Sequence, residues 1–420
     1  MRLKLAAIAL LAFAVRVAYG LIANVPHGFG DDVWFHTVAN GLVDGRGFSD
    51  PFRSLTAGGV PAFGSAGDPI TTAFHPPLFP ALLAIPSALG LDSYTAHQIV
   101  GCAIGAAAVV AIGLVARRLA GDTACVAAAL IAALFLPIVS RDALLQSESL
   151  YGLLIALALL AALRLRDEPT VRNGAWLGAA IGLAALTRGE ALLLVPLLAI
   201  PLAWRRPRVL ALTGVAVAVV CLPWCVRNSL EFDRPTLITT GDGSVIAGSN
   251  LPSTYYGRLL GEWDFAGLYQ TPAGRHPDRN EAVQSERWRD EGIDYARAHA
   301  SRLPVVLGAR VLRTWDLYPF SPVARAEHGS DYYNHVRALE YPAQLMLWVV
   351  VLLAVLGAVG LRRAGKPLWP FVAMVVLVTL VSMAGHGDPR YRHAADVALV
   401  ILAGVGAAGM KGRLWARPSP

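Results

Sequence analysis

The feature that most constrains this chain is a series of apolar runs that recur along the whole sequence. A helix of about 20 mainly apolar residues is long enough to span the hydrocarbon core of a bilayer. Of the 420 residues, 55% are hydrophobic and only 15% are charged, which leaves too little polar surface for a water-soluble fold. The pattern predicts an all-α integral membrane protein that crosses the bilayer many times.

About ten of these runs are expected to be transmembrane helices. They lie at about 3–24, 96–119, 122–139, 148–164, 174–187, 190–204, 208–225, 343–361, 367–384 and 395–410. The first run is longer than the apolar core of a signal peptide, and no small-residue cleavage site follows it cleanly. We therefore expect an uncleaved first span.

The arginine and lysine residues indicate how the helices are oriented. They gather in short clusters beside the apolar runs, and basic loops of this kind stay on the cytoplasmic side. The clusters lie at 2–4, 117–118, 164–172, 205–208, 362–366 and 411–413. Threading the ten runs in order places every cluster inside, so the net charge of +7 reflects membrane orientation and not a nucleic-acid partner.

Two further apolar stretches are not expected to cross the membrane. Residues 76–91 open with two prolines and are short, and counting them as a span would invert every later basic loop. They are expected to lie at the membrane surface or to re-enter it. In residues 303–320, Arg310 and Asp316 interrupt the apolar run, while Trp315 suits the headgroup region. This stretch is also expected to be interfacial.

The predicted topology describes one membrane domain over residues 1–420 with two large extracytoplasmic segments. These segments cover about 25–95 and 226–342, and the second contains a charged stretch at 279–303 with helical spacing. We expect the first segment to be catalytic and the second to shape an acceptor site.

Arginine greatly outnumbers lysine, which occurs only at Lys4, Lys366 and Lys411. This composition is typical of a GC-rich coding sequence and favours a multi-pass protein of a bacterial plasma membrane. The four cysteines lie in or beside apolar runs without metal-site spacing. They are expected to be free thiols.

An acidic pair, Asp31 and Asp32, follows the first span. Adjacent carboxylates at a membrane surface can bind a divalent cation, or one can act as a base whose pKa the other tunes. The structural alternative is that they satisfy the free N–H groups at the start of a helix.

A histidine precedes two prolines at His75-Pro76-Pro77. The proline rings fix the backbone and lack N–H donors, so this is expected to be a rigid corner that starts a short helix. His75 could bind a phosphate or an acceptor hydroxyl, but a single histidine is also a common surface hydrogen-bonding group.

Glu148, Arg188 and Glu190 stand at the outer ends of predicted spans. Charges so close to hydrocarbon are costly, and they tend to be functional or paired. We expect Glu148 to belong to the site and Arg188 with Glu190 to form a local ion pair.

Further arginines occupy the outer ends of other spans, at Arg227 and in the turn Arg390-Tyr391-Arg392. At headgroup depth an arginine can hold a phosphate with two parallel hydrogen bonds. The alternative is membrane anchoring, because arginine and tyrosine are common at interfaces.

Together these residues resemble the C-type (GT-C) glycosyltransferases, in particular the bacterial relatives of the protein O-mannosyltransferases and of the aminoarabinose transferase that modifies lipid A. The resemblance extends over nearly the whole chain. It is carried by Asp31-Asp32, the stretch from Ala39 to Phe48, Pro76-Pro77-Leu78, Glu148, the residues 186–190, 223–228, 248–250 and 255–257, and Pro389-Arg390-Tyr391-Arg392.

The resemblance implies a GT-C-like fold and a sugar donor carried on polyprenyl phosphate. It also implies that an acidic residue of the first outer loop is the catalytic carboxylate. The commonest family pattern has Asp-Glu where this chain has Asp31-Asp32, and often Lys-Pro-Pro where it has His75-Pro76-Pro77. Which aspartate acts, and whether position 75 binds phosphate, therefore stay open at this point.

The expected reaction is inverting transfer of a sugar to an acceptor hydroxyl, with Asp31, ahead of Asp32, as the base. The arginines expected to stabilise the departing phosphate are Arg390, Arg392, Arg227 and Arg188. The other site candidates are His75, Glu148 and Tyr391. No cofactor is certain, and a divalent cation held by Asp31, Asp32 and Glu148 is left open.

The rival interpretation is a transporter or lipid flippase, which would also be polytopic. Such a protein is expected to carry ionisable residues near mid-membrane and to show paired halves. Here the ionisable residues gather at the outer ends of the spans, which favours an enzyme.

Overall fold

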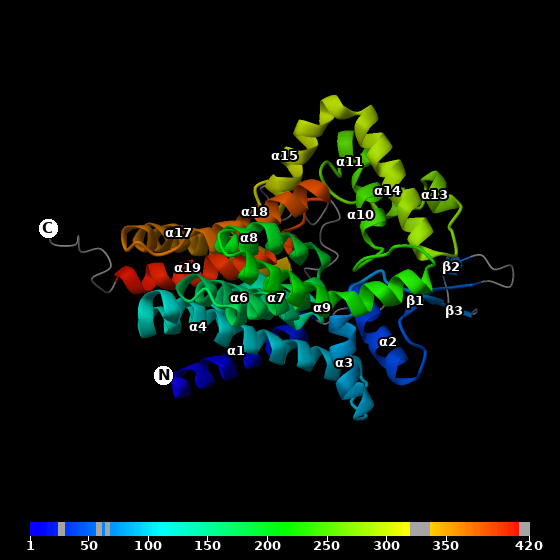
Figure 1. Cartoon of the computed structure of the whole chain (residues 1–420). Coiled ribbons are helices and arrows are strands. Elements are labelled where there is room, and N and C mark those ends of the chain that lie inside the picture. Colours follow the sequence, from blue (N-terminus) through cyan, green and yellow to red (C-terminus); the bar gives the residue numbers. More distant parts are fainter. Residues whose placement is uncertain (24–29, 56–60, 64–67, 320–336, 411–420) are drawn as a thin grey trace.

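The computed structural model describes residues 1–23, 30–55, 61–63, 68–319 and 337–410. Long apolar helices run side by side and form a bundle (Figure 1). Its helices are α1 (Arg2–Ala23), α4 (Tyr94–Leu134), α6 (Glu148–Asp167), α7 (Val171–Ala185), α9 (Pro207–Glu231), α17 (Glu340–Arg363), α18 (Trp369–Ala384) and α19 (His393–Met410). The short helix α5 (Leu136–Ala143) links α4 to α6.

Six helical stretches of the described chain are long and apolar enough to cross a membrane. They are α1, α4, α6, α9, α17 and the stretch Pro389–Gly409 that contains α19. Non-helical dihedral angles at Ala120 and Gly121 divide α4 into two helices, which correspond to two of the predicted runs. The remaining predicted runs fall on shorter helices, so each of the ten coincides with helical structure.

One of these shorter stretches is irregular. Residues 189–203 form a 3-10 helix, η1 (Gly189–Leu193), a π-helical turn, η2 (Val195–Ala199), and one α-helical turn, α8 (Ile200–Ala203). Pro196 and Pro201 lack the N–H groups that a regular α-helix would use here. The sequence predicted the apolar run but not its departure from α-helix.

Small residues allow the helices to pack closely. A Cβ atom at Gly178 of α7 would collide with the Thr213 carbonyl of α9, and one at Gly357 of α17 would collide with the Leu402 carbonyl of α19. Because lipid offers no strong hydrophobic drive for helix association, close backbone contact of this kind is what holds membrane helices together. Glycine at these two positions thus fixes the spacing of the bundle.

The predicted basic clusters within the described residues gather at one end of the bundle, which we name the basic end, whereas the cluster at 411–413 lies outside the described residues. Here Arg118 forms an ion pair with Asp167 at 2.9 Å, and Arg206 donates to the carbonyl of Pro169 at 3.4 Å. Helix α1 begins and α19 ends at this end (Figure 1). The placement of these basic residues at one end agrees with the predicted order and direction of the helices.

The opposite end, which we name the site end, carries the first of the two predicted outer segments. It contains α2 (Asp31–Val43), a small sheet and α3 (Leu78–Ala88). The strands β1 (Ser49–Leu55), β2 (Pro61–Phe63) and β3 (Asp68–Thr71) pair antiparallel in the order β2-β1-β3. The sequence analysis did not predict this sheet.

Helix α3 agrees with the prediction that residues 76–91 do not span the membrane. It has 11 residues, too few to cross the hydrocarbon core, and it lies across the direction of α1 and α4 (Figure 1). Ile85 of this helix and Leu89, the residue just after its end, are 62% and 76% exposed. Such an apolar face suits the membrane surface.

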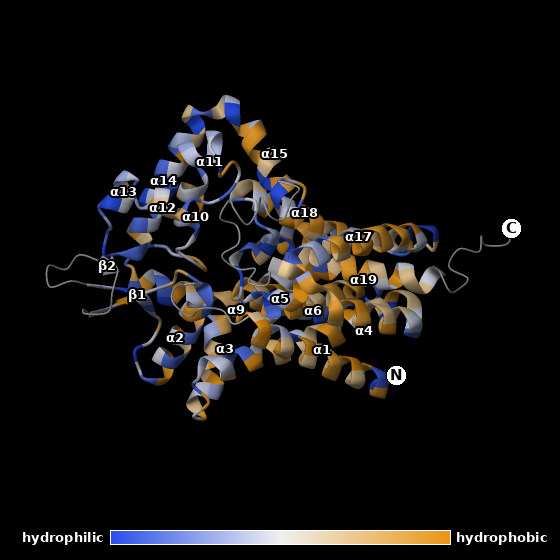
Figure 2. Ribbon diagram, turned by 180° about the vertical axis from the view of Figure 1, so that it is seen from behind, coloured by the Kyte–Doolittle hydropathy of each residue, from blue (hydrophilic) through white to orange (hydrophobic). Residues whose placement is uncertain are grey.

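The second segment at the site end forms a small helical unit. It contains α10 (Asp242–Ser249), α11 (Pro252–Tyr256), α12 (Phe265–Leu268), α13 (Pro272–Arg275), α14 (Glu281–Ala298), η3 (Ala300–Arg302) and α15 (Leu303–Thr314). Helix α14 confirms the predicted charged helix, and α15 covers residues 303–314 of the stretch predicted to be interfacial. The unit is hydrophilic where the bundle is apolar (Figure 2).

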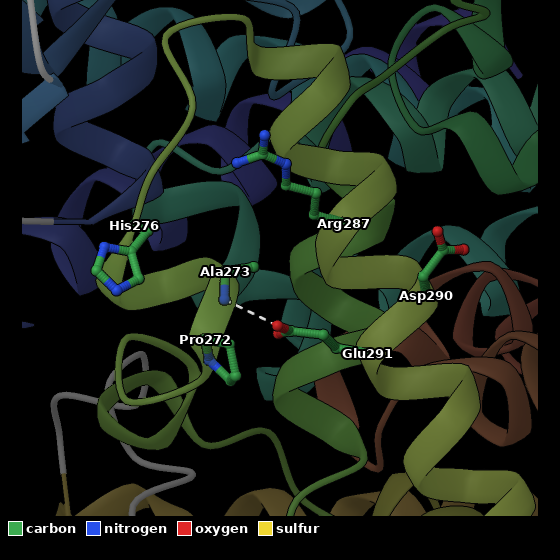
Figure 3. A pocket seen from close by; sticks show the side chains of 6 residues that line it. All are labelled: Pro272, Ala273, His276, Arg287, Asp290 and Glu291. Carbon is green, nitrogen blue, oxygen red and sulfur yellow. Dashed lines mark hydrogen bonds between the residues drawn. The ribbon is translucent and has the colours of Figure 1, made fainter.

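A shallow pocket of about 360 Å³ opens between α13 and α14 of this unit (Figure 3). The lining residues are Pro272, Ala273, His276, Arg287, Asp290 and Glu291. Glu291 accepts a hydrogen bond from the backbone N–H of Ala273 at 2.8 Å and so holds the two helices together. None of the predicted site residues lines this pocket.

Candidate active site

The two aspartates of the acidic pair have different surroundings. Both lie in the first turn of α2, where unpaired N–H groups favour carboxylates. The Asp32 carboxylate is buried and accepts a hydrogen bond from the Tyr94 hydroxyl at 2.8 Å. The Asp31 side chain is 20% exposed and points to other predicted site residues. The structure therefore separates a solvent-accessible carboxylate from one that anchors α2 to α4.

Asp31 lies between an arginine and a histidine. Its Oδ2 atom is 2.6 Å from Nη1 of Arg390, and its Oδ1 atom is 3.3 Å from Nε2 of His75. Burial alone would raise the pKa of Asp31, but the charge of Arg390 and the contact with His75 outweigh it and lower the pKa well below the usual range. Asp31 is consequently ionised at neutral pH.

The proline corner positions His75. The imidazole packs against the rings of Trp34 and Phe35, with centroids 4.7 and 5.0 Å away. The N–H of Leu78, just after the two prolines, donates to the carbonyl of Leu186 at 2.9 Å. The corner is thus fixed on one side by α2 and on the other by the end of α7, close in sequence to Arg188.

Glu148 lies at the centre of the cluster and is fully buried. It accepts a hydrogen bond from Nη1 of Arg188 at 2.7 Å and forms an ion pair with Nε of Arg390. Two guanidinium groups from distant parts of the chain therefore share one carboxylate. Ion pairing of this kind offsets the cost of burying the Glu148 charge.

Arg188 extends the cluster. Its Nε atom is 2.6 Å from Glu190, which confirms the predicted local ion pair. Its guanidinium also lies over the ring of Tyr391 at 5.4 Å from the centroid, a favourable cation–π contact. The Arg188 side chain is 12% exposed and that of Arg390 is 11% exposed, so both lie at the edge of the buried region.

The structure adds residues that the sequence analysis did not single out. His386 is 3.5 Å from the Tyr391 hydroxyl, and burial lowers the pKa of His386 to about 4. It is therefore neutral at pH 7. Trp34 and Phe35 follow the acidic pair after one residue, Val33, and that proximity was the available signal that they would line the same site.

Two arginines predicted to bind the donor phosphate lie elsewhere. Arg392 is 2% exposed and pairs with Asp396 at 2.8 Å and with Asp316 at 2.7 Å. Arg227 donates to the Thr72 carbonyl at 3.0 Å and lies over the ring of Trp224. In this arrangement Arg392 is a buried structural residue, because its partners occupy it and solvent does not reach it. Arg227 supports the chain before His75.

The three carboxylates considered as a cation site do not gather in one place. Asp31 and Glu148 face arginine, whereas Asp32 faces Tyr94. Within the described part of the chain, no three histidine, cysteine, aspartate or glutamate residues are grouped as metal ligands. Arg390 occupies the position between Asp31 and Glu148 that the cation hypothesis assigned to a metal.

The site thus combines one partly exposed carboxylate with two arginines at its edge. The carboxylate can accept a proton or orient a hydroxyl group. The guanidinium groups can hold an anion such as phosphate through charged hydrogen bonds. One bound molecule can contact both the carboxylate and a guanidinium group, because Arg390 contacts Asp31 directly.

Comparison with known proteins gives a family match within the chain. The model of the dolichyl-phosphate-mannose-protein mannosyltransferase family matches residues 74–227. This segment, less than half of the chain, includes His75, Glu148, Arg188 and Arg227. No curated protein sequence matches the chain.

Solved structures show the same fold over nearly the whole chain. The archaeal oligosaccharyltransferase AglB from Archaeoglobus fulgidus, in complex with an inhibitory peptide and a dolichol-phosphate, superposes with a TM-score of 0.53 at 13% identity. That match covers 98% of this chain and 50% of AglB, so the chain spans about half the length of that relative. The complex of the same enzyme with zinc and sulfate gives 0.54 at 14% identity, covering 97% of this chain and 49% of the enzyme.

ArnT from Cupriavidus metallidurans bound to undecaprenyl phosphate gives a TM-score of 0.43 at 14% identity, covering 97% of this chain and 77% of ArnT. The fold rests on the AglB comparison and on the apolar helices of the bundle. The chain is therefore a multi-pass membrane protein with the fold of the C-type (GT-C) glycosyltransferases.

Proposed function

We propose that this protein transfers a sugar from a polyprenyl-phosphate-linked donor to an acceptor hydroxyl group, with inversion at the anomeric carbon. The family that matches residues 74–227 is described as using dolichyl-phosphate-mannose. The AglB structure with the same fold holds a dolichol-phosphate. Both relatives point to a donor whose sugar is carried on a long-chain lipid phosphate.

The observation that carries this proposal is the convergence of Asp31, His75 and Arg390 at the site end of the bundle. These residues come from three distant parts of the chain, yet Asp31 is 2.6 Å from Arg390 and 3.3 Å from His75. Ionisable groups brought together beside hydrocarbon are a signature of function. Their types match what transfer from a phosphate requires.

In the proposed reaction the acceptor hydroxyl gives its proton to Asp31 as its oxygen bonds to the anomeric carbon. The bond between that carbon and the phosphate oxygen breaks, and its electron pair stays on the departing polyprenyl phosphate. Arg390 and Arg188 stabilise the negative charge that grows there. Attack opposite to the leaving group inverts the configuration. No general acid is needed, because a phosphate is already a good leaving group.

The low pKa of Asp31 has a consequence for this mechanism. A carboxylate whose pKa is lowered is always ionised but is a weak base. When the donor phosphate binds Arg390, it shares the guanidinium charge and places a second negative charge near Asp31. Both effects raise the pKa of Asp31. The carboxylate therefore becomes a stronger base when the donor is in place.

His75 contributes through its contact with Oδ1 of Asp31, while Arg390 contacts Oδ2. Two contacts on the two oxygens fix the plane of the carboxylate. This fixed orientation contributes to the reaction rate, because a small misplacement of a reacting group lowers the rate strongly. We assign His75 to orientation of Asp31 and not to phosphate binding.

We further propose that the site end is extracytoplasmic and the basic end cytoplasmic, in a bacterial plasma membrane. The clustering of Arg118 and Arg206 at the basic end supports this orientation. Labelling of single cysteines with an impermeant reagent in intact cells tests it. A cysteine at Arg258, in the second segment, should react, and one at Arg118 should not.

The function is tested by incubating the purified protein with radiolabelled polyprenyl-phosphate sugars and with envelope extracts as acceptors. The expected result is release of the lipid phosphate with transfer of label, and an anomeric configuration opposite to that of the donor. Movement of intact donor across proteoliposomes without cleavage would instead identify a flippase and contradict the proposal.

A further inference from the structure

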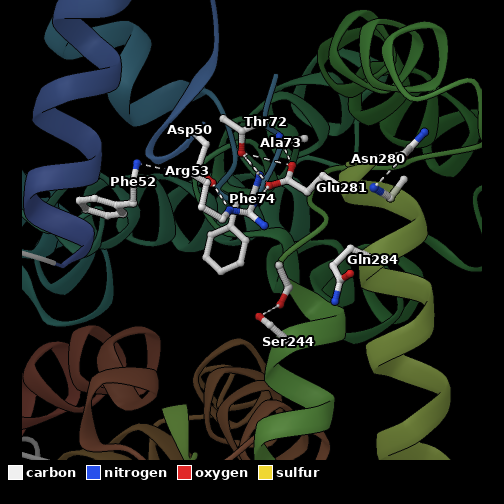
Figure 4. Close-up of polar contacts among 12 residues, drawn as sticks. Asp50, Phe52, Arg53, Thr72, Ala73, Phe74, Ser244, Asn280, Glu281 and Gln284 are labelled. Carbon is white, nitrogen blue, oxygen red and sulfur yellow. Dashed lines mark hydrogen bonds and ion pairs between the residues drawn. The ribbon is translucent and has the colours of Figure 1, made fainter. Parts of the chain in front are cut away.

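The backbone that leads into His75 is held by a glutamate of the second segment. Glu281, the first residue of α14, accepts a hydrogen bond from the N–H of Ala73 at 2.7 Å and one from the hydroxyl of Thr72 at 2.9 Å. Figure 4 shows its side chain reaching from the start of α14 to these two residues. Glu281 and Ala73 are therefore in contact although they are 208 positions apart in sequence. Ala73 lies two residues before His75 in the chain.

Glu281 is built into a buried polar network. It is 5% exposed, and its Oε1 atom is 3.0 Å from Nη2 of Arg53. Arg53 in turn pairs with Asp50 at 2.6 Å. Burial raises the pKa of Glu281, and Arg53 and the Ala73 N–H partly offset that rise. A carboxylate in such a place is costly unless all its partners stay in position.

Other groups of the second segment hold the same stretch through its carbonyl oxygens. The N–H of Thr240 donates to the Ala73 carbonyl at 3.0 Å, and the hydroxyl of Thr239 donates to the Phe74 carbonyl at 2.5 Å. The peptide groups on both sides of Ala73 are thus fixed by residues outside the first segment. His75 is the next residue after this stretch, so these hydrogen bonds also fix the position of its imidazole ring.

We propose that Glu281 is a positioning residue of the active site. Through Thr72 and Ala73 it sets the place of His75 and hence the orientation of Asp31. This inference rests on the proposed function, in which Asp31 is the base. It makes the charged helix α14, which stands outside the bundle, part of the machinery that orients the reacting carboxylate.

The kinetic test compares Glu281→Gln with a matched control on the same helix. The amide keeps the shape but loses the charge that Ala73 and Arg53 bind, so kcat per folded molecule should fall by roughly 10- to 100-fold, as expected for a charged hydrogen bond. KM for the donor should stay nearly constant. Glu281→Asp keeps the charge and should recover part of the loss. In the control Glu286→Gln, kcat should not change. This substitution removes an ion pair with Arg234, and both side chains of that pair are about half exposed.

A second measurement separates positioning from a loss of stability. If Glu281 acts through His75, then adding Glu281→Gln to His75→Ala should lower kcat little further, whereas two independent defects would multiply. Unchanged kcat in Glu281→Gln, or multiplied losses in the double variant, would overturn the inference.

A third readout does not depend on transfer. The NMR signal of a ¹⁵N-labelled His75 ring should shift in Glu281→Gln and in Glu281→Asp, and it should stay unchanged in Glu286→Gln. An unshifted signal in both Glu281 variants would overturn the inference even if the enzyme is active. Absence of transfer by the wild-type protein would contradict the proposed function alone, because the His75 signal would still report on Glu281.

Discussion

Arg390 and Arg392 are two residues apart in the same turn, η6 (Pro389–Arg392), yet they lie in opposite kinds of environment. Arg390 reaches out to Asp31 of α2 and to Glu148 of α6, and its side chain is 11% exposed. Arg392 turns inward to Asp396 and Asp316 and is 2% exposed. One motif thus supplies one residue to a site that solvent reaches and one to a closed structural contact.

The difference shows that the solvent exposure of an arginine, and not its charge alone, decides whether it is available to bind a ligand. The arginine–carboxylate contacts of Arg390 are at an edge where an arriving phosphate can share the guanidinium. The contacts of Arg392 are enclosed, and they join α19 to the turn after α15 through Asp316 and the Thr314 carbonyl. A ligand would have to displace buried carboxylates there, at a cost of several kcal/mol.

The largest expected effect on turnover is that of Asp31→Asn. An amide has nearly the size of the carboxylate but cannot accept the proton, and general base catalysis typically contributes about 10²- to 10⁴-fold. We expect kcat to fall by a factor in this range while donor binding is retained. The measurement is transfer at saturating donor, normalised to folded protein. Asp32→Asn is the control, and its effect should be smaller because Asp32 contacts Tyr94.

If both aspartate variants turned over at close to the normal rate, the pair would have no part in the chemistry. Its role would then be the stabilisation of the first turn of α2.

The next effect in size is that of Arg390→Ala. In the proposed mechanism Arg390 donates to the departing phosphate, and loss of such a charged hydrogen bond costs about 1.5–3 kcal/mol, roughly 10- to 150-fold in kcat. Arg390→Lys should recover only part, because lysine keeps the charge but not the two-pronged geometry. Transfer at saturating donor gives the comparison. Lysine serving as well as arginine would indicate membrane anchoring instead.

A smaller effect is expected in the pH dependence of the wild-type enzyme. In the proposed mechanism Asp31 acts in its deprotonated form, so its lowered pKa should place the acid limb of kcat/KM at low pH in the free enzyme. A donor phosphate bound as proposed would raise that pKa, so the acid limb of kcat should lie at a higher pH. Measuring both profiles from the same data set tests this. Coincident limbs would mean that the donor does not change the basicity of Asp31.

The sequence predicted the bundle well because the physics of spanning helices is local. Apolar runs of sufficient length and the placement of basic clusters depend on neighbouring residues alone. The same reasoning predicted that residues 76–91 and 303–320 do not span, and the helices found there, α3 and α15, have only 11 and 12 residues. It missed the three-stranded sheet, since strand pairing depends on contacts between separate segments. It also missed the irregular helix at 189–203, although Pro196 and Pro201 were a local signal of it.

The site was predicted less completely, and the reason is visible in single residues. Periodicity and spacing placed Asp31, Glu148, Arg188 and Arg390 at the same end of the bundle, but they could not tell which way a side chain turns. Arg392 illustrates this, because only the tertiary packing brings Asp316 and Asp396 against it. The roles of the site residues in transfer stay predictions.

The smallest expected effect on turnover is that of Arg392→Met, although its effect on stability is large. Methionine fills similar space but leaves the Asp396 carboxylate buried without its guanidinium, which typically costs about 3–5 kcal/mol. We therefore expect a clear fall in the thermal unfolding temperature, while kcat per folded molecule stays within about twofold, since Arg392 is buried against Asp316 and Asp396. Removing the carboxylate as well, in Arg392→Met with Asp396→Leu, should restore part of the stability, because replacing a buried pair by apolar residues is often nearly neutral. Thermal unfolding in detergent and transfer at saturating donor together decide the matter. A variant with wild-type unfolding temperature and strongly reduced kcat would place Arg392 beside Arg390 in the site and remove the distinction between them.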